Sequence, residues 1–161
     1  MNAPRHRISP VRDAEDLADA VRLIRAYAAS LDVDLAFQDF EGEMAAMPGP
    51  YGPPGGELLL ARAPDGRAVG CVALRALPLP GTCEMKRLYV APEGRGTGLG
   101  RALVEAVVSV ARSLGHAAIR LDTLPSMKAA QALYAECGFE VVPAYYDSPV
   151  AGTLFLERRL A

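Results

Sequence analysis

Cysteine and histidine are scarce in this chain. The three cysteines, Cys71, Cys83 and Cys137, show no spacing typical of a disulfide framework, and their odd number suits a reducing compartment. Neither His6 nor His116 has metal-ligand spacing with a cysteine, so we expect no metal site. We interpret the cysteines as small core residues and expect a cytoplasmic protein.

Long apolar runs are also missing from the sequence. No stretch approaches the roughly 18 consecutive apolar residues that a membrane-spanning helix needs. No hydrophobic stretch follows the first seven residues, so we do not expect a signal peptide. These two observations predict a protein without a membrane partner.

Positive charge is not in excess, and this argues against a nucleic-acid partner. The formal net charge is −2 over 161 residues, whereas nucleic-acid binding favours a basic face. The charge is uneven, because residues 11–57 contain ten acidic residues against three arginines. With 51% hydrophobic residues, the length suits a single domain that spans residues 1–161.

Hydrophobic periodicity predicts strands interleaved with helices. Asp13 and Asp16 are placed as a capping-box pair at the start of the first helix, and Ser126 is placed to cap the last. Residues 48–56 are so rich in proline and glycine that we expect no regular structure there. The expected strands cover residues 7–11, 57–62, 68–75, 82–90, 117–122, 139–142 and 153–157. The expected helices begin at residues 13, 34, 98 and 126, and the last three end near residues 47, 114 and 136. This order indicates an α/β domain with a mixed sheet.

A glycine-dense turn lies between a strand and a long amphipathic helix. Gly94, Gly96, Gly98 and Gly100 can adopt backbone angles closed to other residues, so their amides can point into one concavity. The helix that starts near Gly98 adds unpaired N–H groups and its positive dipole end. The turn therefore predicts a binding site for a diphosphate.

The spacing of the glycines separates three kinds of phosphate loop. A P-loop needs Gly-Lys followed by Ser or Thr, but Arg101 and Ala102 follow Gly100. A dinucleotide fingerprint that starts at Gly96 needs its third glycine at position 101, where the chain has Arg101. The pattern that remains is R-x-x-G-x-G, formed by Arg95, Gly98 and Gly100.

This loop resembles the acyl-CoA pyrophosphate loop of the GNAT superfamily of N-acetyltransferases. Residues 88–92 are similar to the family's central strand and the proline that ends it, and residues 98–114 to its phosphate-capping helix. Residues 129–139 resemble its A-x-x-L-Y-x-x-x-G-F segment, and the clearest match spans residues 57–141. The resemblance implies a mixed, largely antiparallel central sheet, flanked by helices and splayed at the acetyl-CoA site. It also implies acetyl-CoA as co-substrate and no metal.

The same resemblance implies which residues hold the co-substrate. The pantetheine arm is expected to pair with the main chain of the strand before the turn, and the turn and helix start are expected to hold the diphosphate. The residues concerned are Leu88, Tyr89, Val90, Arg95, Gly96, Thr97, Gly98, Leu99, Gly100 and Arg101. Many relatives have asparagine seven residues before the tyrosine of the L-Y segment, where this chain has Met127.

Transfer of an acetyl group to an amine requires a base and benefits from an acid. Freeing the lone pair of an alkylammonium near pH 7 costs roughly 4 to 5 kcal/mol, since its pKa is about 10.4. Glu84 precedes Arg95 by eleven residues, the offset at which some members of the family have a catalytic glutamate, so the resemblance makes it the candidate base. Glu84, Lys86, Leu88 and Val90 are expected to share one face of their strand. An ion pair of Glu84 with Lys86 or a sheet neighbour is the alternative. Tyr134 matches the family's tyrosine that is thought to protonate the departing sulfur, with a core tyrosine as the alternative.

The acceptor is expected to be a primary amine of a small molecule or peptide. Four loop residues are placed near its pocket: Tyr51, Tyr145, Tyr146 and Asp147. The acidic segment 11–57 favours a cationic acceptor, although solvated acidic helix faces explain it equally well. An acyl-CoA-binding sensor without turnover is the alternative function, and a homodimer is left open.

Overall fold

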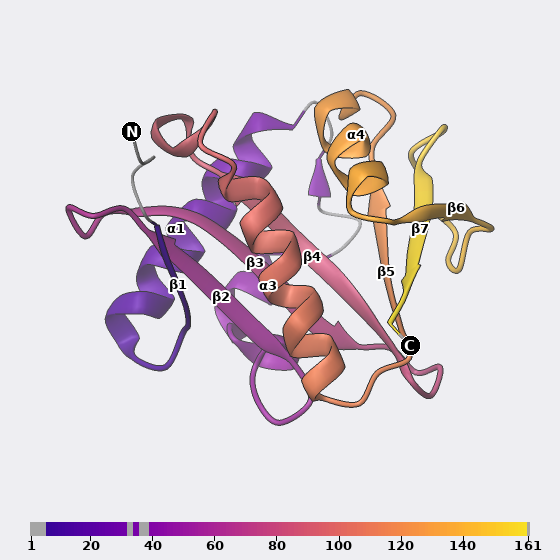
Figure 1. Ribbon diagram of the computed structural model, residues 1–161, viewed down its shortest axis with the longest axis horizontal. Helices are drawn as coiled ribbons and strands as arrows, with labels where there is room; N and C mark the ends of the chain where they lie inside the picture. Colours follow the sequence, from indigo (N-terminus) through magenta and orange to yellow (C-terminus); the bar gives the residue numbers. More distant parts are fainter. Residues whose placement is uncertain (1–5, 32–33, 36–38, 161) are drawn as a thin grey trace.

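One seven-stranded sheet forms the frame of the computed structural model, which describes residues 6–31, 34–35 and 39–160. The strand order is β1-β2-β3-β4-β5-β7-β6 (Figure 1). The strands are β1 (Arg7–Pro10), β2 (Glu57–Arg62), β3 (Ala68–Ala76), β4 (Thr82–Val90), β5 (Ala118–Thr123), β6 (Glu140–Val142) and β7 (Leu154–Arg159). Neighbouring strands are antiparallel except β4 and β5, which are parallel. The expected mixed, largely antiparallel sheet is therefore confirmed.

Helices cover both faces of this sheet. The helices are α1 (Ala14–Ser30), α2 (Phe40–Ala46), α3 (Leu99–Ser113) and α4 (Lys128–Glu136), with short 3₁₀ turns η2 (Gly49–Tyr51) and η3 (Pro92–Gly94). In Figure 1, α3 crosses one face of the sheet and α1 lies behind the other. Each face has its own core cluster, one with α3 and α4 and one with α1 and α2. The sheet is thus the middle layer of three.

The periodic residues of α3 explain why it packs on the sheet. Leu99, Leu103, Val104 and Val107 lie on one stripe and are at most 2% exposed. Burial of each such side chain stabilises the fold by about 1.5 to 3 kcal/mol. The helix ends at Ser113, and Gly115, just beyond its C-cap, has a φ of 85°, the left-handed conformation that closes helices.

Asp13 caps the first helix as its sequence predicts, whereas the Asp16 carboxylate of the expected capping-box pair accepts a hydrogen bond from Arg62. The Asp13 side chain accepts a hydrogen bond of 2.8 Å from the Asp16 amide at the start of α1. The cap of α4 differs from expectation, because Met127 occupies the N-cap position and Ser126 lies one residue too early. A turn causes this shift: the Met127 amide donates to the Leu124 carbonyl at 3.0 Å.

The second helix is shorter than expected, and the loop after it contains some regular structure. Asp39 has a left-handed backbone (φ 53°, ψ 50°), so α2 starts only at Phe40. Residues 36–38 of the expected helix lie outside the described residues. Within the loop 48–56, η2 forms a single 3₁₀ turn that buries Tyr51.

Candidate active site

The parallel strands β4 and β5 separate part-way along their length. They pair at Thr82–Ala118, Cys83–Ile119 and Glu84–Arg120, and beyond Glu84 the described sheet shows no further pairing between them. Splayed strands leave main-chain N–H and C=O groups available to a ligand. The split therefore leaves the second half of β4 without a described strand neighbour on the β5 side.

A bulge at Arg87 changes which face the β4 side chains reach. Arg87 has a φ of 59°, and the register against β3 shifts between Cys71 and Ala73. Leu88 and Val90 consequently pack toward the α3 core, while Lys86 pairs with Asp122 on the face covered by α1. The expectation that Glu84, Lys86, Leu88 and Val90 share one face is wrong, because the extra residue of the bulge reverses the alternation.

A groove of about 390 Å³ runs past the end of β4 and the starts of α3 and α4. Eight of the ten residues expected to hold the co-substrate line it: Leu88, Tyr89, Val90, Arg95, Gly96, Gly98, Leu99 and Gly100. Its other lining residues are Tyr27, Ser30, Gly94, Met127, Ala129, Ala130 and Leu133. The glycine turn and the second half of β4 are thus parts of one wall.

Two of the four glycines of the turn, Gly96 and Gly98, have the left-handed backbone expected of them, whereas Gly94 and Gly100 do not. Gly96 and Gly98 have φ of 76° and 80°, and Gly98 is the N-cap of α3. Because glycine carries no side chain, it leaves the first N–H groups of α3 open to a ligand. The Thr97 hydroxyl donates 2.6 Å to the Gly94 carbonyl, so it holds the turn without lining the groove. Arg101 also lies outside the groove wall and donates to the Glu136 carbonyl at 3.3 Å.

A second, smaller cavity of about 40 Å³ lies between the splayed strands. It shares Tyr27, Leu88 and Met127 with the groove, so the two spaces meet beside the bulge in β4. Its polar lining residues are Lys86, Arg87, Asp122, Thr123, Tyr134, Tyr146, Ser148 and Thr153. A ligand that follows the groove along β4 reaches this polar cavity.

Tyr134 occupies the wall of the cavity on the α4 side. Its side chain is 6% exposed, and its ring packs against Phe139 with 5.9 Å between centroids. Its hydroxyl has no hydrogen bond to any residue that the structure describes. Burial raises the pKa of Tyr134 above the ordinary value of 10, so the phenol stays protonated at neutral pH. The residue combines the surroundings of a core tyrosine with access to the cavity.

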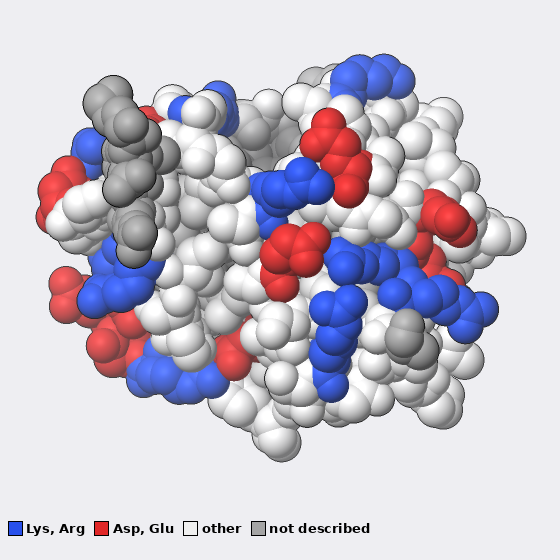
Figure 2. Space-filling view, in the orientation of Figure 1, with Lys and Arg blue, Asp and Glu red and all other residues white. Residues whose placement is uncertain are grey.

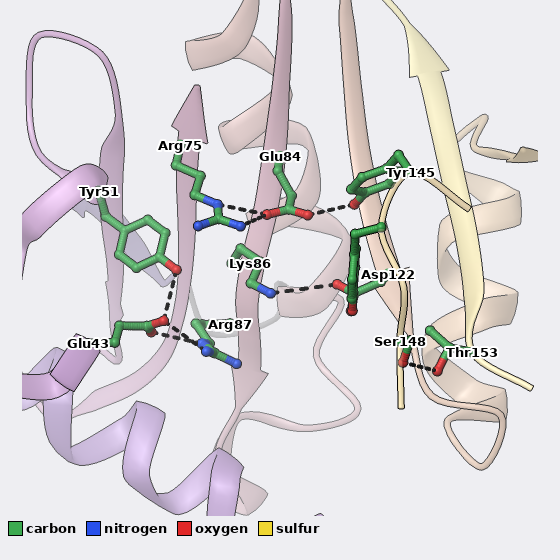
Figure 3. A network of polar contacts seen from close by, with 11 residues as sticks. Glu43, Tyr51, Arg75, Glu84, Lys86, Arg87, Asp122, Tyr145, Ser148 and Thr153 are labelled. Atoms are coloured by element: carbon green, nitrogen blue, oxygen red, sulfur yellow. Dashed lines mark hydrogen bonds and ion pairs between the residues drawn. The ribbon is translucent and has the colours of Figure 1, made fainter. Parts of the chain in front are cut away.

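Glu84 lines neither of the two spaces. Figure 3 shows it between Arg75 and Tyr145. It is 1% exposed, and Arg75, its partner across β3 and β4, donates to Oε1 at 2.8 Å. The Tyr145 hydroxyl donates to Oε2 at 2.6 Å. With both oxygens engaged, this geometry favours the ion-pair alternative for Glu84 over the role of base.

Asp122 is a carboxylate in the cavity wall and was not among the site residues expected from the sequence. It lies near the end of β5, with Oδ1 3.7 Å from the Lys86 ammonium, and it accepts a hydrogen bond from the Tyr146 hydroxyl (Figure 3). Its position at the carboxyl end of a parallel strand was the available signal, because ligands bind at such ends where neighbouring strands diverge.

Comparison with known proteins identifies the family of this chain. A family model described as "Acetyltransferase (GNAT) family" matches residues 24–139. The chain belongs to this family. It is 39% identical over 154 residues to an uncharacterized N-acetyltransferase of Schizosaccharomyces pombe, with 96% of this chain and 94% of the relative covered. It is 33% identical over 147 residues to N-acetylaspartate synthetase of Rattus norvegicus, with 89% of this chain and 49% of that protein covered.

A solved structure supports the fold assignment of this GNAT protein. The structure is a phosphinothricin acetyltransferase from Sinorhizobium meliloti in complex with AcCoA. It matches with a TM-score of 0.69 at 19% identity and covers 96% of this chain and 88% of that one. With its family, the present protein is an N-acetyltransferase of the acyltransferase class, and acetyl-CoA is its co-substrate.

The residues expected near the acceptor of this acetyltransferase lie in three different places. Tyr146 lines the small cavity, and Tyr145 lies behind it on Glu84. Asp147 is exposed and lines neither space. Tyr51 is 1% exposed and donates to a Glu43 oxygen at 3.2 Å, so it lies in the core away from both. Of the four, only Tyr146 is therefore positioned to touch a ligand there.

Several charged residues in the described part of this GNAT protein form ion pairs. Arg62 contacts Asp16 and Asp19 at 2.6 and 2.9 Å, and Arg87 contacts Glu43 at 2.9 Å. On the face shown in Figure 2, acidic and basic side chains lie next to one another. Within residues 6–31, 34–35 and 39–160 there is no cluster of His, Cys, Asp and Glu that could hold a metal ion. No helix in the same ranges is long and apolar enough to cross a membrane.

Proposed function

We propose that this acetyltransferase moves the acetyl group of acetyl-CoA directly to a primary amine of a small molecule or peptide. Asp122 acts as the base and Tyr134 as the acid. The observation that carries the proposal is the meeting of the groove and the small cavity at Tyr27, Leu88 and Met127. The groove offers amides to a diphosphate, while the cavity holds one carboxylate and one buried phenol where the thioester would arrive.

The co-substrate fits the groove because of the chain's own main-chain groups. Gly96 and Gly98 present a turn whose next N–H groups belong to the uncapped start of α3. Beyond Glu84, β4 has a described strand neighbour on the β3 side alone, so its other edge can pair with an extended pantetheine arm. An N–H group of this edge is also suited to stabilise the oxyanion of the tetrahedral intermediate.

Asp122 is placed to remove the proton from the acceptor. An ammonium in the cavity would lie beside this carboxylate, and a positioned base of this kind contributes about 10² to 10⁴ in rate. Glu84 remains important as a positioning residue, since it anchors Tyr145 and the segment that carries Tyr146. The base role first expected for Glu84 is therefore transferred to Asp122 in this proposal.

Tyr134 is placed to protonate the departing sulfur of coenzyme A. Burial raises the pKa of Tyr134, so the residue holds its proton until charge develops on the sulfur. A thiol ionises near pH 8.5, which makes the thiolate a fair leaving group. Assistance from Tyr134 should therefore matter less than deprotonation of the amine by Asp122.

The ion pairs of the acidic N-terminal residues affect which class of acceptor we expect. Asp16, Asp19 and Glu43 are engaged by arginines, which weakens the field that would draw a cationic acceptor. The acceptor panel should therefore include zwitterions as well as diamines. Aspartate belongs in it, because one relative is named N-acetylaspartate synthetase. A cytoplasmic location and an acceptor other than nucleic acid also stay within the proposal, on the grounds of composition.

The test is release of the coenzyme A thiol from acetyl-CoA in the presence of a panel of amines. The panel holds a diamine, lysine, aspartate and a short peptide with a free N-terminus. We expect turnover with at least one amine, and much slower turnover in Asp122→Asn and Tyr134→Phe. Binding of acetyl-CoA by calorimetry without turnover of any amine would instead favour a sensor.

A further inference from the structure

Thr123, the last residue of β5, carries a buried hydroxyl without a partner. Thr123 is 3% exposed. Among the buried side-chain nitrogen and oxygen atoms that the structure describes, Thr123 Oγ1 is the one without a hydrogen-bond partner. A buried hydroxyl left unpaired costs about 1 to 3 kcal/mol. Thr123 lines the small cavity, so a rotation of its side chain about χ1 can bring Oγ1 to a ligand held there, which would supply the missing partner.

The alternation of β5 decides which part of the ligand Thr123 meets. Side chains two residues apart on a strand share a face, so Thr123 lies on the same face as Leu121. Leu121 is part of the core cluster that contains Tyr134, whereas Asp122 points to the opposite face, toward Lys86 and Tyr146. The cavity thus has a hydroxyl wall and a carboxylate wall.

The two walls correspond to the two ends of the reaction. The carboxylate wall suits the acceptor amine, which must lose protons to a base. The hydroxyl wall, with Thr123 and Tyr134, suits the group that gains electrons, because hydroxyl donors stabilise negative charge. In acetyl transfer, that group is the sulfur of coenzyme A.

We propose that Thr123 Oγ1 donates a hydrogen bond to the coenzyme A sulfur, beside Tyr134, and so forms a thiolate subsite. The inference rests on the proposed function. When the carbon–nitrogen bond forms and the carbon–sulfur bond breaks, the electron pair of the broken bond goes to sulfur. Tyr134 gives the sulfur its proton, while Thr123 keeps its own and stabilises the charge until that transfer is complete.

The protons of this step balance. An ammonium acceptor and acetyl-CoA give an amide, the free thiol of coenzyme A and one proton. The nitrogen loses two protons in all: Asp122 passes one to solvent, and the second restores the Tyr134 hydroxyl. Thr123 therefore begins and ends the cycle unchanged, as a donor that touches the leaving atom.

The experiment compares coenzyme A with desulfo-coenzyme A, in which hydrogen replaces the thiol. Calorimetry gives both affinities for wild type, Thr123→Val and Thr123→Ser at pH 7 and pH 9. We expect wild type to prefer coenzyme A, and more strongly at pH 9, because the thiol ionises near pH 8.5. Thr123→Val replaces the hydroxyl by a methyl group. In this variant, the ratio of the affinity for coenzyme A to that for desulfo-coenzyme A should fall about tenfold at pH 9. Thr123→Ser should retain the wild-type ratio.

The desulfo ligand separates a sulfur contact from a structural role. Equal loss of affinity for both ligands in Thr123→Val, or an unchanged ratio at both pH values, would overturn the thiolate subsite. Absence of any coenzyme A binding in wild type would overturn the proposed function as well, so the two failures differ. If Thr123→Val does not fold, ultraviolet titration of the thiol bound to wild type decides: a bound pKa no lower than that of free coenzyme A refutes the subsite.

Discussion

The Tyr145 hydroxyl donates a 2.6 Å hydrogen bond to Oε2 of Glu84, a residue 61 positions earlier in the chain. Arg75 occupies the other carboxylate oxygen at 2.8 Å. These contacts tie the segment after β6 to the middle of the sheet, close to where β4 and β5 separate. The buried carboxylate therefore holds the wall of the cavity in place through Tyr145 and its neighbour Tyr146.

Replacement of Glu84 separates this holding role from that of a base. We expect Glu84→Gln to lower the free energy of unfolding by about 2 kcal/mol, since it leaves Arg75 half-buried without its counter-charge. The pH dependence of kcat should keep the wild-type shape, because the base is elsewhere. Chemical denaturation and a pH–rate profile measure the two effects, and Tyr145→Phe is the control that removes only the neutral contact. Wild-type stability combined with a hundredfold loss of kcat would restore Glu84 as the base.

Replacement of Asp122 tests the proposed base directly. We expect Asp122→Asn to lower kcat about a hundredfold or more, because the amide cannot accept the proton of the acceptor. The KM for acetyl-CoA should change little, since Asp122 does not line the groove. Steady-state kinetics with the best acceptor of the panel measure both constants. Tyr146→Phe is the control, as it keeps the carboxylate and removes its hydrogen-bond donor. If Asp122→Asn keeps more than a third of the wild-type kcat, water or another group is the base.

The burial of Tyr134 leads to a prediction about the reaction rate at alkaline pH. Burial raises the pKa of Tyr134 above the ordinary value of about 10, and a raised phenol pKa means that the proton is retained to higher pH. The rate should therefore rise with pH as free amine accumulates, without a descending limb below about pH 10. Tyr134→Phe should lower kcat roughly tenfold to a hundredfold and keep the ascending limb. A descending limb near pH 8 that disappears in Tyr134→Phe would contradict the assigned burial.

The parts of the fold that could be predicted depend on local chemistry. The stripe of α3, the cap at Asp13 and the left-handed glycines at positions 96 and 98 follow from residues within a few positions of one another. For the same reason the glycine turn was a reliable guide to the groove. Helix and strand bounds were less accurate, as for α2, which begins at Phe40 and not at the expected residue 34, because Asp39 before it has a left-handed backbone.

The remaining features depend on contacts that local patterns do not carry. The bulge at Arg87 places a non-glycine residue at positive φ, and this is stabilised by its ion pair with Glu43, 44 positions away. That shift moved Leu88 to the other face and invalidated the expected row that included Glu84. The ion pairs of the acidic N-terminal segment could not be predicted either. Arg62, which lies on β2, neutralises Asp16 and Asp19 of that segment.

The ion pair between Arg12 and Glu57 predicts a loss of stability in acid. Burial favours a higher pKa for Glu57, but the hydrogen bonds from Arg12 and from the Leu58 amide outweigh it, so the pKa is lowered. A lowered carboxyl pKa stabilises the fold above the unfolded value of about 4.5, and this stabilisation is lost as pH falls through the folded value. Glu57→Gln should cost about 1 kcal/mol at pH 7, given that Arg12 is half exposed. In urea denaturation, the free energies of unfolding of wild type and Glu57→Gln should converge below pH 4.5. A difference between them that stays constant down to pH 3 would contradict the linkage.

Gly98 and Gly115 form a matched pair for testing the groove. Both have left-handed backbones, with φ of 80° and 85°, and a Cβ at either would meet no heavy atom within 4 Å beyond its chain neighbours. Alanine at either position should therefore lower the free energy of unfolding by about 1 to 2 kcal/mol through backbone strain alone. Only Gly98 lines the groove, so Gly98→Ala should weaken acetyl-CoA binding at least tenfold, because relief of strain moves the amides at the start of α3. Gly115→Ala should bind acetyl-CoA as wild type does. Calorimetry on the two variants decides the matter, since equal affinities would show that the turn does not hold the diphosphate.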